Sequence, residues 1–175
     1  MSKMSRNSAL ILPLVLAACA APMQAPVAPS AVTPPAGSNY SMTAVGIGEI
    51  TYECRAKAGA ADAFEWVFVA PVATLYDSRK TVVGKYYGGP TWEAADGSKV
   101  TGKQLAVAPT TGTGNIPLQL VQANPATGSG AMTDVSYIQR LNTQGGVAPA
   151  APCAMANVGA KQQVKYQADY VFYKK

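Results

Sequence analysis

Histidine is absent from this chain of 175 residues. Its absence excludes Ser-His-Asp and Cys-His nucleophilic mechanisms and most zinc sites, and it removes the commonest general base at neutral pH. Charged residues are also scarce, at 13% of the chain, and the lysines and arginines do not gather into the basic stripe that nucleic-acid binding requires. We therefore expect no nucleic-acid partner, no bound metal and no cofactor.

The apolar run near the N-terminus, residues 9–18, is about half the length of about 20 residues that a helix needs to cross a bilayer. It follows Lys3 and Arg6 and ends in Leu16-Ala17-Ala18-Cys19, which is the pattern of a bacterial lipoprotein signal peptide. We predict that residues 1–18 are removed and that Cys19 then carries acyl chains such as palmitate. The alternative is an ordinary secretory signal in which Cys19 is incidental.

A lipidated Cys19 would anchor the protein to a membrane without spanning it. The next residue, Ala20, is not the aspartate that is associated with retention in the inner membrane. In a host with two membranes we therefore expect the chain on the periplasmic face of the outer membrane.

Without Lys3 and Arg6 the mature chain has 12 basic and 9 acidic residues, a formal net charge of only +3.

Three cysteines are present, and lipidation of Cys19 leaves Cys54 and Cys153 in an oxidising compartment. We predict a disulfide between them, which would tie the start of the domain to its last third. Two buried free thiols are the alternative.

The segment after the cysteine is rich in Ala, Pro, Ser and Thr and has almost no charge, so it cannot bury a core. We predict that residues 19–43 are the lipidated cysteine and a disordered tether. The remaining residues, 44–175, have the length of one ordinary domain.

The apolar residues of this domain repeat with a period of two, which is typical of half-buried strands. The last segment is the best example: Val164, Tyr166, Ala168, Tyr170 and Phe172 share one face. Glycine and proline clusters separate the segments, and no long amphipathic helix competes. We predict an all-β fold, a single antiparallel sandwich or barrel with one disulfide. Strands are expected at residues 49–54, 64–68, 72–77, 81–87, 91–95, 99–107, 116–122, 133–141 and 164–172.

Several separated strings resemble the DUF3455 family of secreted proteins. They are Gly84 to Glu93 (GKYYGGPTWE), Asp96-Gly97-Ser98, Ile138 to Gly146 (IQRLNTQGG), Tyr52-Glu53-Cys54, Trp66-Val67-Phe68 and the closing Tyr166 to Tyr173. The resemblance spans nearly the whole mature domain. It implies no particular activity, because the family is named for having no assigned function.

Trp92, Glu93 and Asp96 stand beside a Gly-Gly-Pro turn and form one candidate binding edge. An aromatic platform with flanking carboxylates suits a sugar. The alternatives are that Trp92 packs inside while the acids cap a hairpin, or that Glu93 and Asp96 are the carboxylates of a glycosidase. Tyr86 and Tyr87 are further candidates for the lining of a cleft, although aromatic residues at strand spacing are commonly core.

Arg140 is the last candidate, because it lies in an expected strand between the apolar Ile138 and Leu141. Its guanidinium would either clamp an anionic ligand or pair with a buried carboxylate such as Glu53 or Glu65. The internal ion pair is the alternative that we favour from the sequence.

These residues predict an envelope lipoprotein that binds a glycan, another envelope protein or a small ligand without catalysis. A structural or stress-related envelope component is the second hypothesis, and a hydrolase that uses Glu93 and Asp96 is the third. An exposed aromatic cleft beside Trp92 would favour binding, whereas a fully packed interior would favour the structural role.

Overall fold

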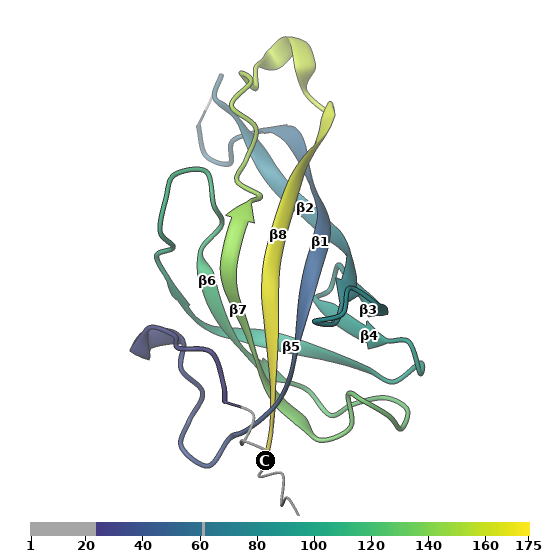
Figure 1. Cartoon of the computed structure of the whole chain (residues 1–175). Helices are drawn as coiled ribbons and strands as arrows, with labels where there is room; N and C mark the ends of the chain where they lie inside the picture. The colour runs from purple at the N-terminus through teal and green to yellow at the C-terminus, as the bar shows by residue number, and fades with distance from the viewer. Residues whose placement is uncertain (1–23, 61) are drawn as a thin grey trace, which may run out of the picture.

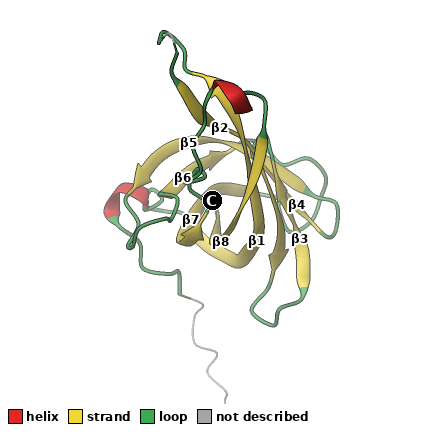
Figure 2. Ribbon diagram, turned by 90° about the horizontal axis from the view of Figure 1, so that it is seen from above, coloured by secondary structure: helices red, strands yellow, loops and turns green. Residues whose placement is uncertain are grey.

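The protein folds into a closed barrel of eight antiparallel strands, in which β8 pairs with β1 to complete the circle (Figures 1 and 2). The computed structural model describes residues 24–60 and 62–175. The predicted signal peptide and Cys19 lie outside the described residues. The strands are β1 (Asn39–Ala56), β2 (Phe64–Tyr76), β3 (Val82–Tyr87), β4 (Thr91–Ala94), β5 (Lys99–Ala108), β6 (Leu118–Ala123), β7 (Val135–Gly145) and β8 (Lys161–Lys174), and two short 3-10 helices are η1 (Ser30–Val32) and η2 (Met155–Asn157).

The antiparallel order gives the barrel two distinct ends. The connections after β1, β3, β5 and β7 all open at one end, which also carries η2 and which we call the disulfide end. The start of β1 at Asn39 and the end of β8 at Lys174 pair with each other at the opposite end, which we call the terminal end. In Figure 1 the disulfide end is at the top and the C-terminus at the bottom.

Alternation along the strands places one face of each strand inside the barrel. The prediction for the last strand is confirmed, because Tyr166, Ala168, Tyr170 and Phe172 are all buried in the central core and Val164 packs against it. Glycine makes room for these rings: a Cβ atom on Gly46 would lie 2.5 Å from the ring of Tyr170. Core packing of this kind explains why a small residue of β1 lies beside a large one of the neighbouring strand β8.

A second core lies on the outside of the barrel, under residues 25–38, which we call the N-terminal strap. Val32 of η1 is fully buried there among Leu118, Leu141, Val171 and other apolar side chains. The tether predicted for residues 19–43 is therefore wrong from residue 25 onward, because apolar residues of β6, β7 and β8 face outward and the strap covers them. The predicted domain boundary at residue 44 is also too late, since β1 begins at Asn39.

The predicted disulfide between Cys54 and Cys153 is confirmed. It joins the end of β1 to the long segment before β8, 99 residues later. Of the two predicted architectures the structure is the barrel. The segments at 64–68 and 72–77, which were predicted as two strands, are parts of the single strand β2. Within the described part of the chain no helix is long and apolar enough to cross a membrane.

Candidate ligand-binding site

The six candidate binding residues do not form one site. Tyr86, Trp92 and Arg140 occupy interior-facing positions in the barrel, whereas Tyr87 and Glu93 lie on its outer surface and Asp96 lies in the turn between β4 and β5. Neighbouring residues of one strand point to opposite faces of the sheet. The side chains of Tyr86 and Tyr87 therefore lie on opposite sides of the barrel wall, and so do those of Trp92 and Glu93.

Trp92 is not an exposed sugar platform, since only 1% of its surface is accessible. Its ring stacks on Tyr86, with the centroids 4.8 Å apart, and meets the edge of Tyr170 at 5.7 Å. The alternative that Trp92 packs inside is the observed one. Its indole Nε1 is buried and has no hydrogen-bond partner among the described residues.

Glu93 belongs to a small polar cluster on the outside of β3 and β4. Its carboxylate accepts a hydrogen bond of 2.7 Å from the Tyr87 hydroxyl and lies 3.2 Å from Nζ of Lys85. The Tyr87 hydrogen bond and the contact with Lys85 lower the pKa of Glu93. A carboxyl with a lowered pKa stays ionised at neutral pH and is unsuited to act as a general acid.

Asp96 holds the turn between β4 and β5, as the hairpin alternative predicted. Its carboxylate accepts hydrogen bonds from the side chain and main chain of Ser98 and from the main-chain N–H of Ala131, and these bonds lower its pKa. Because both carboxylates are ionised and held by local donors, the geometry gives no support to a hydrolase that uses Glu93 and Asp96.

Arg140 points into the barrel from β7. Its neighbour two positions back, Ile138, is part of the central core, whereas Leu141 belongs to the core under the N-terminal strap. The predicted ion pair with Glu53 or Glu65 is wrong: Glu53 pairs with Arg55 on the surface, and within residues 24–60 and 62–175 no carboxylate forms a salt bridge with Arg140. Its partner is instead the main-chain carbonyl of Pro117, which accepts from Nε at 3.2 Å and Nη2 at 2.9 Å.

Arg140 is one of the residues that line a cavity of about 350 Å³, which we call the mouth cavity. It includes Gly89 and Pro90 of the β3–β4 turn, so it belongs to the disulfide end of the barrel. None of the nine acidic residues, all of which are described, is among its lining residues. The lining residues are Phe68, Pro71, Tyr86, Gly89, Pro90, Gly102, Gln104, Gln119, Val121 and Arg140.

The positive charge of Arg140 affects the pKa values of three tyrosines in the centre of the barrel. Burial raises the pKa of Tyr86, Tyr166 and Tyr170, and the positive charge of Arg140 opposes the rise in all three. The hydroxyls of Tyr166 and Tyr170 lie 3.1 Å apart and share a hydrogen bond. These phenols are therefore neutral at physiological pH and act as hydrogen-bonding groups next to a permanent cation.

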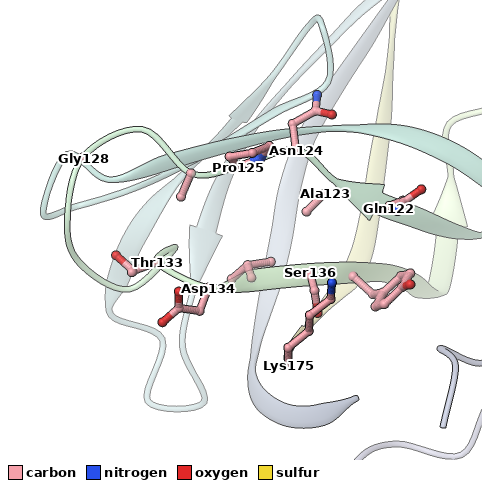
Figure 3. A pocket seen from close by; sticks show the side chains of 12 residues that line it. Gln122, Ala123, Asn124, Pro125, Gly128, Thr133, Asp134, Ser136 and Lys175 are labelled. Carbon is pink, nitrogen blue, oxygen red and sulfur yellow. The ribbon is translucent and has the colours of Figure 1, made fainter. Parts of the chain in front are cut away.

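A second cavity, of about 450 Å³, lies at the terminal end between the loop after β6 and the C-terminal residue (Figure 3). Its charged groups are Asp134 and Lys175, which are both exposed. Opposite charges in open solvent contribute little to binding. The mouth cavity differs because the one charged residue among its described lining residues, Arg140, is partly buried and has no opposite charge beside it there.

Arg140 and Tyr86 were recognisable from the sequence as candidates, but six other side chains of the mouth cavity were not: Phe68, Pro71, Pro90, Gln104, Gln119 and Val121. The alternation of β5 and β6 shows which residues share a face, but closure of the barrel decides which strands face each other across the interior. The side chains of Gln104 and Gln119 are joined by a hydrogen bond, a contact that no local pattern predicts.

Among the residues that the structure describes, no three His, Cys, Asp or Glu side chains come together as a metal site requires. The fold and the cavity thus define an all-β barrel with a cationic pocket at one end. Residues 35–174 match the family described as "Protein of unknown function (DUF3455)", and the chain belongs to this family. No curated protein and no solved structure matches the chain.

Proposed function

We propose that this protein is a cell-envelope lipoprotein, anchored through Cys19, that binds a small molecule in the mouth cavity without catalysing a reaction. The observation that carries the proposal is a partly buried arginine, Arg140, which has no counter-ion within residues 24–60 and 62–175 and lines a concave site at the end of a closed barrel. Pockets of about 300 to 1,000 Å³ with a few convergent polar groups are the usual form of small-ligand sites.

The anchor rests on the sequence Leu16-Ala17-Ala18-Cys19 after a short apolar run. Ala25, which packs against the core under the N-terminal strap, lies only six positions after Cys19. Six extended residues span at most about 20 Å. A lipid on Cys19 would therefore hold the barrel close to the membrane surface, at the outer membrane if the host has two membranes.

Two measurements test the proposal on the full chain expressed in a bacterium. Labelling with an acyl-chain analogue should mark the wild-type protein and not Cys19→Ser, and Cys19→Ser should leave the membrane fraction. Persistent labelling of Cys19→Ser would refute the anchor.

The binding role is tested by a thermal-shift screen of the protein purified from envelopes in a non-ionic detergent. The panel holds small acids, small neutral molecules, envelope glycans and divalent metals. A ligand at 100 times its dissociation constant adds about 2.7 kcal/mol to the free energy of unfolding and raises Tm by several degrees. A saturable shift with a small molecule supports the proposal, and a panel without any shift contradicts it.

A structural role in the envelope is the second candidate, because the interior around Trp92 is packed rather than open. A protein with this role would show no shift with any small molecule. Cross-linking in intact envelopes would then be expected to join it to a neighbouring protein.

A further inference from the structure

The guanidinium of Arg140 forms hydrogen bonds along one of its edges and none along another within the described residues. The Nε–Nη2 edge donates to the carbonyl of Pro117. The Nη1–Nη2 edge has no protein partner among the described residues, and this edge carries two parallel N–H donors. Two parallel donors match the two oxygens of one carboxylate.

Main-chain contacts of the neighbouring residue hold the carbonyl of Pro117, and this carbonyl orients the guanidinium of Arg140. The main chain next to Pro117 is tied to β7, since Ile116 donates its N–H to the carbonyl of Gly145 at 2.9 Å and accepts from the Thr143 hydroxyl at 2.6 Å. A guanidinium that is already oriented loses little conformational freedom when a ligand binds. Arg140 is therefore preorganised for binding an anion.

The charge of the cavity selects the charge of its ligand. Among the described residues, Arg140 is the only charged side chain that lines it. A monocarboxylate has one negative charge and balances this cation, whereas a phosphate monoester carries about 1.5 to 2 negative charges at neutral pH and would leave charge unpaired. An unpaired charge beside a partly buried group is costly.

The walls of the cavity select the rest of the ligand. Phe68, Pro71, Tyr86 and Val121 present apolar surface, and the paired amides of Gln104 and Gln119 add polar groups between β5 and β6. A cavity of about 350 Å³ is near the small end of ligand pockets. Aromatic and proline surfaces of this kind pack well against a flat apolar body.

We propose that the mouth cavity recognises a small monocarboxylate with a flat apolar or aromatic body, and that Arg140 binds its carboxylate. This inference rests on the proposed function, because it names the ligand class of the same site. Tyr86 then packs against the body of the ligand. Because Trp92 stacks on Tyr86, the spectroscopic signals of its indole should change when the ligand binds.

Titration calorimetry on the protein from envelopes, in a non-ionic detergent, tests the ligand class. The probes are two matched pairs: benzoate with benzamide, and phenylacetate with phenylacetamide. We expect each acid to bind at least about tenfold more tightly than its amide, because a charge-assisted pair with Arg140 is lost in the amide. Arg140→Gln should remove this preference.

Arg79→Gln is the matched control, because it is the same substitution at a side chain that is 85% exposed in the turn after β2. It changes the net charge equally and should leave the preference intact. Arg140→Lys keeps the positive charge but removes the two parallel donors of the guanidinium, so the preference for the acid over the amide should become smaller without disappearing. If Arg140→Gln does not fold, Arg140→Lys and the acid–amide ratio of the wild type decide the question.

The two proposals fail in different ways. Equal binding of acid and amide, or an unchanged preference in Arg140→Gln, overturns the ligand class but leaves a small-molecule site. Absence of binding by every member of both pairs overturns the ligand class, and the wider thermal-shift screen then decides whether the proposed function falls as well.

Discussion

The side-chain amide of Gln139 donates a hydrogen bond of 2.6 Å to the main-chain carbonyl of Val32, 107 residues earlier in the chain. The amide oxygen of Gln139 in turn accepts from the hydroxyl of Tyr173 at 2.7 Å. All three residues are buried, so a polar network and an apolar cluster together bind the N-terminal strap to the outside of the barrel. The segment that leads toward the predicted anchor is thus part of the folded domain.

Val32→Ala should destabilise the protein by about 1 to 3 kcal/mol, because it removes two methyl groups from a fully buried site. Val27→Ala is the control within the same strap, since the Val27 side chain is 99% exposed and its truncation should change little. Urea unfolding of the two variants measures the difference. Equal stability of the two would show that the strap does not hold to the barrel in solution.

Cys153→Ser should lower the free energy of unfolding by up to about 4 to 5 kcal/mol. The bridge closes a loop with a sequence separation of 99 residues, and a loop of about this length gives that upper value in the chain-entropy account. Urea unfolding before and after addition of a reductant measures the effect, and the reduced wild type should match the variant. A native, unreduced protein that reacts with two equivalents of a thiol reagent would contradict the bridge.

Gly46→Ala should destabilise the barrel, because the new methyl group would lie 2.5 Å from the ring of Tyr170. Overpacking of this kind costs about 1 to 3 kcal/mol. In the Tyr170→Leu background the ring is gone, so the same substitution should cost much less. A double-mutant cycle measured by urea unfolding gives the coupling, and additive effects would argue against this contact.

Stability should fall at alkaline pH because three tyrosines are buried in the barrel. Burial raises the folded-state pKa of Tyr86, Tyr166 and Tyr170 above that of the unfolded chain, near 10. The unfolded state therefore loses these protons first, so the contribution is complete below about pH 10 and is lost as the pH rises toward the folded-state values. Each tyrosine adds up to about 1.4 kcal/mol per pH unit to the slope.

Tyr170→Phe tests this origin of the alkaline slope. Urea unfolding at about pH 9 and about pH 11 should show a smaller loss of stability in the variant than in the wild type. In a pH titration, the part of the tyrosinate absorbance that comes from Tyr86, Tyr166 and Tyr170 should rise late and together with unfolding. An identical slope in both proteins would place its origin in other groups.

Local patterns in the sequence predicted the strands well but not their closure. The inward face of β8 follows from a period of two, which is a property of neighbouring residues. In contrast, residues 39–43 belong to β1 only because they pair with the end of β8, and Val32 is buried only because Leu141 and Val171 face outward. Such contacts join distant parts of the chain and leave no periodic signal in a proline-rich segment.

The candidate site shows the same division. Arg140 was recognisable as a cation in an apolar strand, yet the sequence favoured an ion pair with Glu53 or Glu65 that the register does not allow. Glu53 lies between inward-facing Tyr52 and Cys54 and so points outward, where Arg55 and Lys161 meet it. The alternation of β1 excludes Glu53 as a counter-ion, and this alternation is visible in the sequence. The hydrogen bonds from Arg140 to the carbonyl of Pro117 are not predictable from the sequence, because they join β7 to the residue before β6.

The most direct test of the mouth cavity is a chemical-shift titration of isotope-labelled protein with benzoate. Binding in the mouth cavity should move the Nε–H signal of Arg140 and the amide signals of Gly89, Gly102 and Gln119, with a smaller response from the indole of Trp92. Signals from Asn124, Asp134 and Lys175, which line the cavity at the terminal end, should stay in place. Shifts confined to that second group, or no shifts at saturating benzoate, would contradict the account.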